Sequence, residues 1–298
     1  MPFQTFETPN ARYQVFHDRA AGQDAPTVVF LHGGPGFNTH GERKTLAPAL
    51  SGRVNALWFD LIGCADSPAI SPEKITWQNQ NDDIAAIVRH FVGKPVHYIG
   101  HCIGAFMTHD LVRRHRDTVG GVTWYAPIIS VSDVFKSLIQ RSLREERLNP
   151  AELTNEQRHF MDRFLSIPES GFGLPEITFV LEMAAKIRGF QELYWTDLGA
   201  MERYVGWMTE KPFAPEVYFR IMTDFFGTVD KSIADYTGIP VHALYADDDQ
   251  IAPWSAQGSK VVAQIPHAKA TLIRGGCHWM HFQKTQETAE ATLAFLGR

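Results

Sequence analysis

The chain has 298 residues, of which 44% are hydrophobic and 20% are charged. These fractions are near the average for globular proteins and exclude a disordered, collagen-like or coiled-coil chain. The 28 Lys and Arg residues against 33 Asp and Glu residues give a net charge of −5, with no long run of like charge, so we expect neither a nucleic-acid nor a membrane partner.

The cysteines and the start of the chain bear on the compartment. Cys64, Cys102 and Cys277 are an odd and sparse set, which is more typical of a reducing compartment than of a disulfide framework. The opening residues MPFQTFETPNARYQVFHDRA lack the basic patch, apolar stretch and cleavage site of an export signal. No apolar run approaches the roughly 18 residues of a membrane span. We therefore expect a cytoplasmic protein.

Short, nearly all-apolar runs recur along the chain and predict buried β-strands. In chain order they are TVVFLH (27–32), VNALWFD (54–60), PVHYIG (95–100), VTWYAP (122–127), VHALYA (241–246) and ATLIRG (270–275). Helical segments such as 80–92 and 104–116 lie between them, and QKTQETAEATLAFLGR predicts a closing helix. Apolar strands that alternate with helices are typical of a mostly parallel sheet covered on both faces, so we expect an α/β fold.

The strand pattern stops between about 128 and 235, where helical periodicity replaces it. The helical stretches are 133–148, 155–167, 177–195 and 215–229. Because predicted strands precede and follow this region, it is inserted within the strand order of the sheet. We expect a core formed by 1–127 and 236–298, and a helical cap formed by 128–235 over one edge of the sheet.

The sequence GHCIG at 100–104 joins a predicted strand to a predicted helix. A nucleophile at such a turn has a strained backbone, and the residues two positions before and after it must lack side chains so that strand and helix can approach. Gly100 and Gly104 meet this demand. Cys102 is therefore the candidate nucleophile, and the alternative is an inert thiol in a tight crossover.

A glycine-rich bend, HGGPG at 32–36, follows the first predicted strand. Such a bend leaves backbone N–H groups free to point at a developing oxyanion. We expect the amide of Gly34, together with the amide of Ile103 just past the nucleophile, to form an oxyanion hole. A simple turn is the alternative.

Asp249 and His278 each follow a late predicted strand, at the edge where open α/β sheets build their sites. The order nucleophile, acid, histidine along the chain is the order found in α/β-hydrolases. These residues are the candidate acid and base.

With these motifs the chain resembles the α/β-hydrolases and, among them, the proline iminopeptidase-like members. HGGPG matches their oxyanion loop, and WFDLIGCADSP at 58–68 resembles their Asp-x-Arg-Gly-x-Gly-x-Ser loop. Their Gly-x-x-Asp-x-x-x-Pro segment corresponds to ADDDQIAP at 246–253, which selects Asp249 among three consecutive carboxylates. The chain departs from the pattern at Ile62, Ala246 and Cys277, and at Cys102, where the family has serine.

These residues predict an acyl-transfer enzyme with a Cys-His-Asp triad. His278 would activate Cys102, Asp249 would orient and stabilise the ring, and a small-molecule acyl substrate would form a thioester at Cys102. We expect no cofactor. We also expect no metal, because Cys277, His278 and His281 lack the further ligands that a zinc site needs.

The acceptor of the acyl group leaves several hypotheses open. If the acceptor is water, the protein is a hydrolase of an ester, thioester, lactone or activated amide. If the acceptor is an alcohol, amine or thiol, it is an acyltransferase.

An aminopeptidase is a weaker hypothesis, because a thiolate leaves a tetrahedral intermediate more readily than an amine does. It would need amine-binding carboxylates from the cap, for which the candidates are Glu169, Glu176, Glu192, Asp197 and Glu202. A non-catalytic binding protein is the last hypothesis, and the complete triad argues against it.

Overall fold

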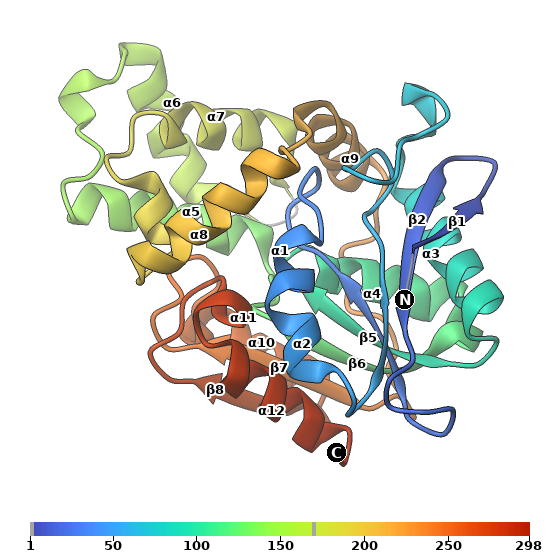
Figure 1. Cartoon of the computed structure of the whole chain (residues 1–298). Helices are drawn as coiled ribbons and strands as arrows, with labels where there is room; N and C mark the ends of the chain where they lie inside the picture. The colour runs from blue at the N-terminus through green and yellow to red at the C-terminus, as the bar shows by residue number, and fades with distance from the viewer. Residues whose placement is uncertain (1–2, 169–170) are drawn as a thin grey trace.

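The computed structural model describes residues 3–168 and 171–298, whose strands form one eight-stranded sheet (Figure 1). The strands are β1 (Gln4–Glu7), β2 (Arg12–Asp18), β3 (Thr27–Leu31), β4 (Asn55–Trp58), β5 (Val96–His101), β6 (Val119–Tyr125), β7 (Val241–Ala246) and β8 (Lys269–Ile273). Their order in the sheet is β1-β2-β4-β3-β5-β6-β7-β8. Neighbours from β4 to β8 pair in parallel, whereas β1 and β2 are antiparallel. The predicted mostly parallel α/β sheet is confirmed.

Helices cover both faces of the sheet. On one side lie α3 (Trp77–Phe91) and α4 (Gly104–Arg114), and on the other lie α2 (Leu46–Leu50) and α12 (Thr285–Phe295) (Figure 1). Successive side chains of a strand point to opposite faces, so Val29 and Leu31 join one apolar cluster while Phe30 joins the other. All residues of β3, β4, β5 and β7 are buried, and burial on both faces is why β3 and β7 are largely apolar.

The two N-terminal strands were not among the predicted elements. In β2 the burial alternates, with Tyr13, Val15 and His17 buried and the residues between them partly exposed. Such alternation is typical of a strand with one face toward the core, and it is weaker in sequence than the continuous apolar runs of the inner strands.

Between β6 and β7 the described chain is helical. Its α-helices are α5 (Val131–Arg144), α6 (Asn155–Ser166), α7 (Leu174–Ala184), α8 (Leu198–Glu210) and α9 (Pro215–Gly227), with the short 3₁₀ helices η3 (Pro150–Glu152) and η5 (Phe190–Leu193). Figure 1 shows them gathered apart from the helices that flank the sheet. Helix α8 was not predicted; Asp197 caps it by accepting the amide of Ala200 at 3.1 Å. We call 128–235 the cap segment, and its boundaries as a domain stay a prediction. In the described residues no helix has both the length and the apolar character needed to cross a membrane.

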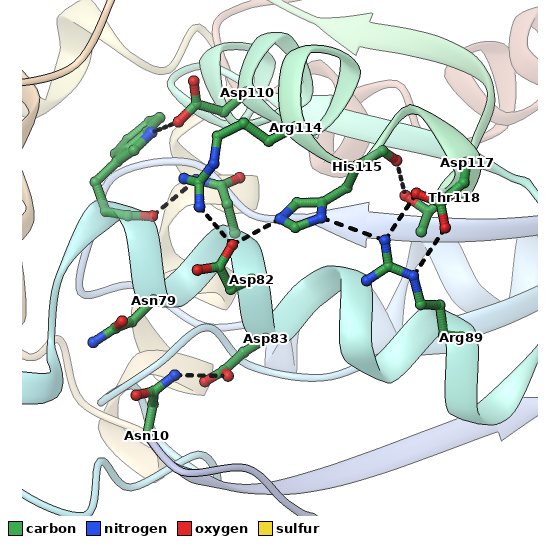
Figure 2. A network of polar contacts seen from close by, with 12 residues as sticks. Asn10, Asn79, Asp82, Asp83, Arg89, Asp110, Arg114, His115, Asp117 and Thr118 are labelled. Atoms are coloured by element: carbon green, nitrogen blue, oxygen red, sulfur yellow. Dashed lines mark hydrogen bonds and ion pairs between the residues drawn. The ribbon is translucent and has the colours of Figure 1, made fainter.

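A polar network fastens α4 to α3 (Figure 2). Asp82 of α3 pairs with Arg114 at 2.6 Å and with His115 at 2.7 Å, and Arg89 pairs with Asp117 at 2.8 Å. Each exposed pair contributes roughly 0–1 kcal/mol at most, but together they fix the C-terminal end of α4. The other end of that helix begins two residues after Cys102.

Candidate active site

Cys102 lies at a strained turn between β5 and α4. Its φ is +55°, in the left-handed region that few side chains adopt. A Cβ atom on Gly100 would lie 2.6 Å from the carbonyl oxygen of Gly104, and one on Gly104 would lie 2.5 Å from that of Leu31. The two glycines therefore permit the close strand–helix approach that the sequence predicts.

His278 and Asp249 lie side by side at the carboxyl ends of β8 and β7. The Nδ1 atom of His278 is 3.1 Å from Oδ2 of Asp249, and the two residues are only 1% and 4% exposed. The other carboxylate oxygen, Oδ1, accepts the amides of Ile251 and Ala252, each at 2.8 Å. These bonds direct Oδ2 at the ring, so that Nδ1 donates and Nε2 is left to face the nucleophile.

The neighbouring carboxylates of the same loop, Asp247 and Asp248, are exposed. Of the three consecutive acids, only the one selected by its spacing to Pro253 reaches the histidine.

Cys102 lies close enough to His278 for its charge to act on the ring. Burial by itself lowers the pKa of His278, but the negative charges of Asp249 and then of Cys102 outweigh it and raise this pKa to about 10. His278 therefore holds its positive charge at neutral pH beside Cys102.

The glycine-rich bend after β3 lies against the nucleophile. A Cβ atom on Gly33 would lie 3.1 Å from that of Cys102, and Gly34 has φ of +44°. In the chain as described, the amides of Gly34 and Ile103 donate no hydrogen bond to a protein acceptor. Two unpaired amides next to the nucleophile are what an oxyanion hole requires.

His32 holds this bend in place. Its Nε2 accepts the amide of Leu61 at 3.1 Å, and its Nδ1 lies 3.2 Å from the carbonyl oxygen of Gly33. Burial lowers the pKa of His32, which keeps the ring neutral and lets one nitrogen accept while the other donates.

His101, which directly precedes the candidate nucleophile in the chain, is fully buried. Burial lowers its pKa well below the usual value for histidine, and its Nε2 donates to the carbonyl oxygen of His278 at 3.1 Å. A Cβ atom on Gly33 would lie 2.4 Å from its Nδ1. His101 thus connects the glycine-rich bend to the loop that carries His278.

A buried acid–histidine pair lies behind the site and was not foreseen. Glu42, in the short helix α1 (His40–Lys44), is 1% exposed and has Oε1 3.4 Å from Nε2 of His281. The rings of His281 and His101 are 4.5 Å apart. Burial raises the pKa of Glu42 to about 8, so its carboxyl group holds a proton at neutral pH. Nothing in HGERK marks this acid as buried, because its neighbours are polar.

We expect Glu42 to lower the free energy of unfolding of the protein as the pH rises from 4.5 to 8. Since its pKa is higher in the folded chain (about 8) than in the unfolded chain (4.5), its stabilising contribution is complete below pH 4.5 and is lost up to pH 8. At about 1.4 kcal/mol per pKa unit, the loss is a few kcal/mol. Urea unfolding from pH 4 to 8 should show this component in the wild type and not in Glu42→Gln. The exposed Glu202→Gln is the control; parallel curves for wild type and Glu42→Gln would contradict the expectation.

Three of the five cap carboxylates considered for binding an amine are engaged elsewhere. Glu176 accepts the amide at the start of α7 at 2.9 Å, Glu192 pairs with an arginine at 3.1 Å, and Asp197 caps α8. Glu202 is exposed, and Glu169 lies outside the described residues. Within residues 3–168 and 171–298, no group of three or more ligand-type side chains is placed to hold a metal.

The sequence motifs missed two tyrosines of the cap segment, Tyr194 and Tyr218, which interact electrostatically with Cys102. They belong to no local motif, because cap and nucleophile meet only in the folded chain.

A family model described as the alpha/beta hydrolase family matches residues 28–291, which include the bend, the turn at Cys102, Asp249 and His278. The chain belongs to the alpha/beta hydrolase family. A proline iminopeptidase of Lactobacillus helveticus is 26% identical over 172 residues, which are 57% of this chain and 50% of that protein. The match thus spans half the length of this curated relative.

Solved structures agree with this alpha/beta hydrolase fold. A proline iminopeptidase-related protein from Thermus thermophilus has a TM-score of 0.69 at 15% identity, with 99% of this chain and 96% of that chain covered. Bromoperoxidase from Bacillus anthracis has a TM-score of 0.62 at 18% identity, with 99% and 100% covered. At such identities the likeness concerns the fold.

Proposed function

We propose that the protein hydrolyses an ester, thioester, lactone or activated amide through a thioester at Cys102. The observation that carries this proposal is the buried His278–Asp249 pair, with Nδ1 and Oδ2 at 3.1 Å, next to a thiol on a strained turn. Membership in the alpha/beta hydrolase family supports hydrolase chemistry.

In the proposed first step, the thiolate of Cys102 attacks the carbonyl carbon, and the C=O electron pair moves onto the oxygen. The amides of Gly34 and Ile103 bind this oxyanion, each worth roughly 2.7–4 kcal/mol. The bond to the leaving group then breaks as His278 gives it a proton, which leaves a thioester and a neutral ring.

In the second step, water loses a proton to His278 and attacks the thioester. The carbon–sulfur bond breaks, the acid product leaves, and the thiolate and imidazolium are restored. No external electron donor or acceptor is needed in either step.

An aminopeptidase reaction has less support, although proline iminopeptidase is the name of a relative. Expulsion of an amine competes with expulsion of the thiolate, which is the better leaving group. Three of the cap acids that were candidates for holding a substrate amine are already bonded within the cap segment.

Acyl labelling tests the nucleophile. After incubation with a p-nitrophenyl or thioester acyl probe, intact-mass analysis should show one acyl adduct on the wild type and none on Cys102→Ala. Cys64→Ala is the matched control, because Cys64 is buried and should leave the adduct in place. Equal labelling of wild type and Cys102→Ala would remove Cys102 from the reaction.

The acyltransferase alternative shares this thioester and differs only in the acceptor. Adding alcohols, amines or thiols to the same assay, and measuring the ratio of hydrolysis product to transfer product, distinguishes the acyltransferase from the hydrolase. A product ratio that does not respond to any acceptor supports the hydrolase, whereas transfer to an acceptor in preference to water supports the transferase.

A further inference from the structure

Two phenol groups of the cap segment lie beside the proposed nucleophile. Tyr194 directly follows η5, and its ring meets that of His278 edge to face, with centroids 5.6 Å apart and planes at 80°. Tyr218 lies in the first turns of α9. Both hydroxyl groups interact electrostatically with Cys102, and that of Tyr194 also interacts with Tyr218. Both phenols therefore lie within electrostatic range of Cys102.

The hydroxyl groups of Tyr194 and Tyr218 are available to hydrogen-bond a ligand. Across residues 3–168 and 171–298, neither hydroxyl is hydrogen-bonded to another protein group, and both residues are only partly buried. Burial, followed by the charge of Cys102, raises the pKa of Tyr194 and raises that of Tyr218 to about 12. Both phenols therefore keep their protons at neutral pH and can donate hydrogen bonds.

Tyr218 is held in a fixed relation to the oxyanion loop. The amide of Ala214, just before α9, donates to the carbonyl oxygen of Gly36 at 2.8 Å. The rings of Phe213 and Phe37 are 5.0 Å apart. A Cβ atom on Gly36 would lie 2.5 Å from the carbonyl oxygen of Ala214, so the two segments are in close contact. The start of α9, which carries Tyr218, therefore lies against the oxyanion loop.

The charge around the phenols limits what they can bind. The side chains that act electrostatically on Tyr194 are Cys102, Tyr218 and Asp249, all of them acidic groups. The only cation beside these groups is the imidazolium of His278, which Asp249 and Cys102 already offset. A substrate carboxylate placed here would add a third negative charge against this one positive charge and would be repelled. A neutral oxygen acceptor has no such penalty.

We propose that the hydroxyl groups of Tyr194 and Tyr218 form a subsite for a neutral oxygen of the acyl group, close to the scissile carbonyl. The substrate class is then an acyl compound with an oxo, hydroxy or ether oxygen at the α or β position, in preference to a plain hydrocarbon acyl group. This inference rests on the proposed function, since it needs an acyl group at Cys102.

A pair of isosteric substrates tests the subsite. Phenyl esters of methoxyacetic and butanoic acid have acyl chains of equal length and differ in one ether oxygen. We expect the ratio of their kcat/KM values, methoxyacetyl over butanoyl, to fall by roughly 3- to 10-fold in Tyr194→Phe and further in Tyr194→Phe/Tyr218→Phe, since one neutral hydrogen bond is lost per hydroxyl. The intrinsic reactivity of the two esters cancels when one enzyme is compared with another.

Tyr204→Phe is the control, because the Tyr204 hydroxyl is also unpaired but is buried in an aromatic cluster around Trp279 and Phe282. Its ratio should equal that of the wild type. A ratio unchanged in the Tyr194 and Tyr218 variants, or an equal fall in the rates of both esters, would overturn the subsite. A wild type that forms no adduct at Cys102 with either ester would instead overturn the proposed function itself.

Discussion

Replacing Asp249 with asparagine is expected to slow acylation of Cys102 by about 10⁴-fold, the size of the effect that the same change has in a Ser-His-Asp triad. Oδ1 accepts two backbone amides, so the amide oxygen of the asparagine would take that place. Its NH₂ group would then face Nδ1 of His278, where a donor meets a donor. The imidazole of His278 would then favour the tautomer without a proton on Nδ1, and its charged form would be disfavoured.

The pH dependence should change in the same variant. With an alkyl ester, acylation by the wild type should fall as the pH rises through about 10, where His278 loses the proton that the leaving group needs. Because the charge of Asp249 helps to raise this pKa, the fall should begin at lower pH in Asp249→Asn. Single-turnover rates across pH check both effects. Asp248→Asn, in the exposed neighbour, should behave as the wild type; similar rates for the two variants would contradict the assignment of Asp249.

Gly104→Ala is expected to cost on the order of 1–3 kcal/mol of the free energy of unfolding, or more. The added Cβ would lie 2.5 Å from the carbonyl oxygen of Leu31, and because this atom belongs to the backbone of β3, α4 would have to move away from the sheet. Acylation should fall as well, since the same movement shifts the turn that carries Cys102.

Gly206→Ala provides the matched control for this prediction. Gly206 lies within α8, and a Cβ atom there would meet no atom within 4 Å. Alanine is the better helix former by about 1 kcal/mol, so this variant should equal or exceed the wild type in stability. Urea unfolding measures both, and an equal free energy of unfolding for Gly104→Ala and Gly206→Ala would refute the steric argument.

The inner strands could be predicted because burial on both faces demands continuous apolar runs, as at 27–32 and 241–246. The antiparallel strand β2, between β1 and β4, could not be predicted in the same way, because its partly exposed side chains interrupt the apolar run. Helix α8 was also missed; its start is marked by Asp197, but the exposed Leu198 and Val205 blur its apolar face.

By itself the sequence determined the motifs whose chemistry is local: glycines around Cys102, the glycine-rich bend, and an acid chosen by its spacing to Pro253. Steric and hydrogen-bonding demands of a tight turn act between residues a few positions apart, so they leave a readable pattern. Only the tertiary structure decided that Glu42 is buried, that His101 bonds the carbonyl of His278, and that Tyr194 meets its ring. These contacts join residues that are far apart in the chain, and the burial of Glu42 is also caused by such residues. A short stretch of sequence therefore cannot indicate them.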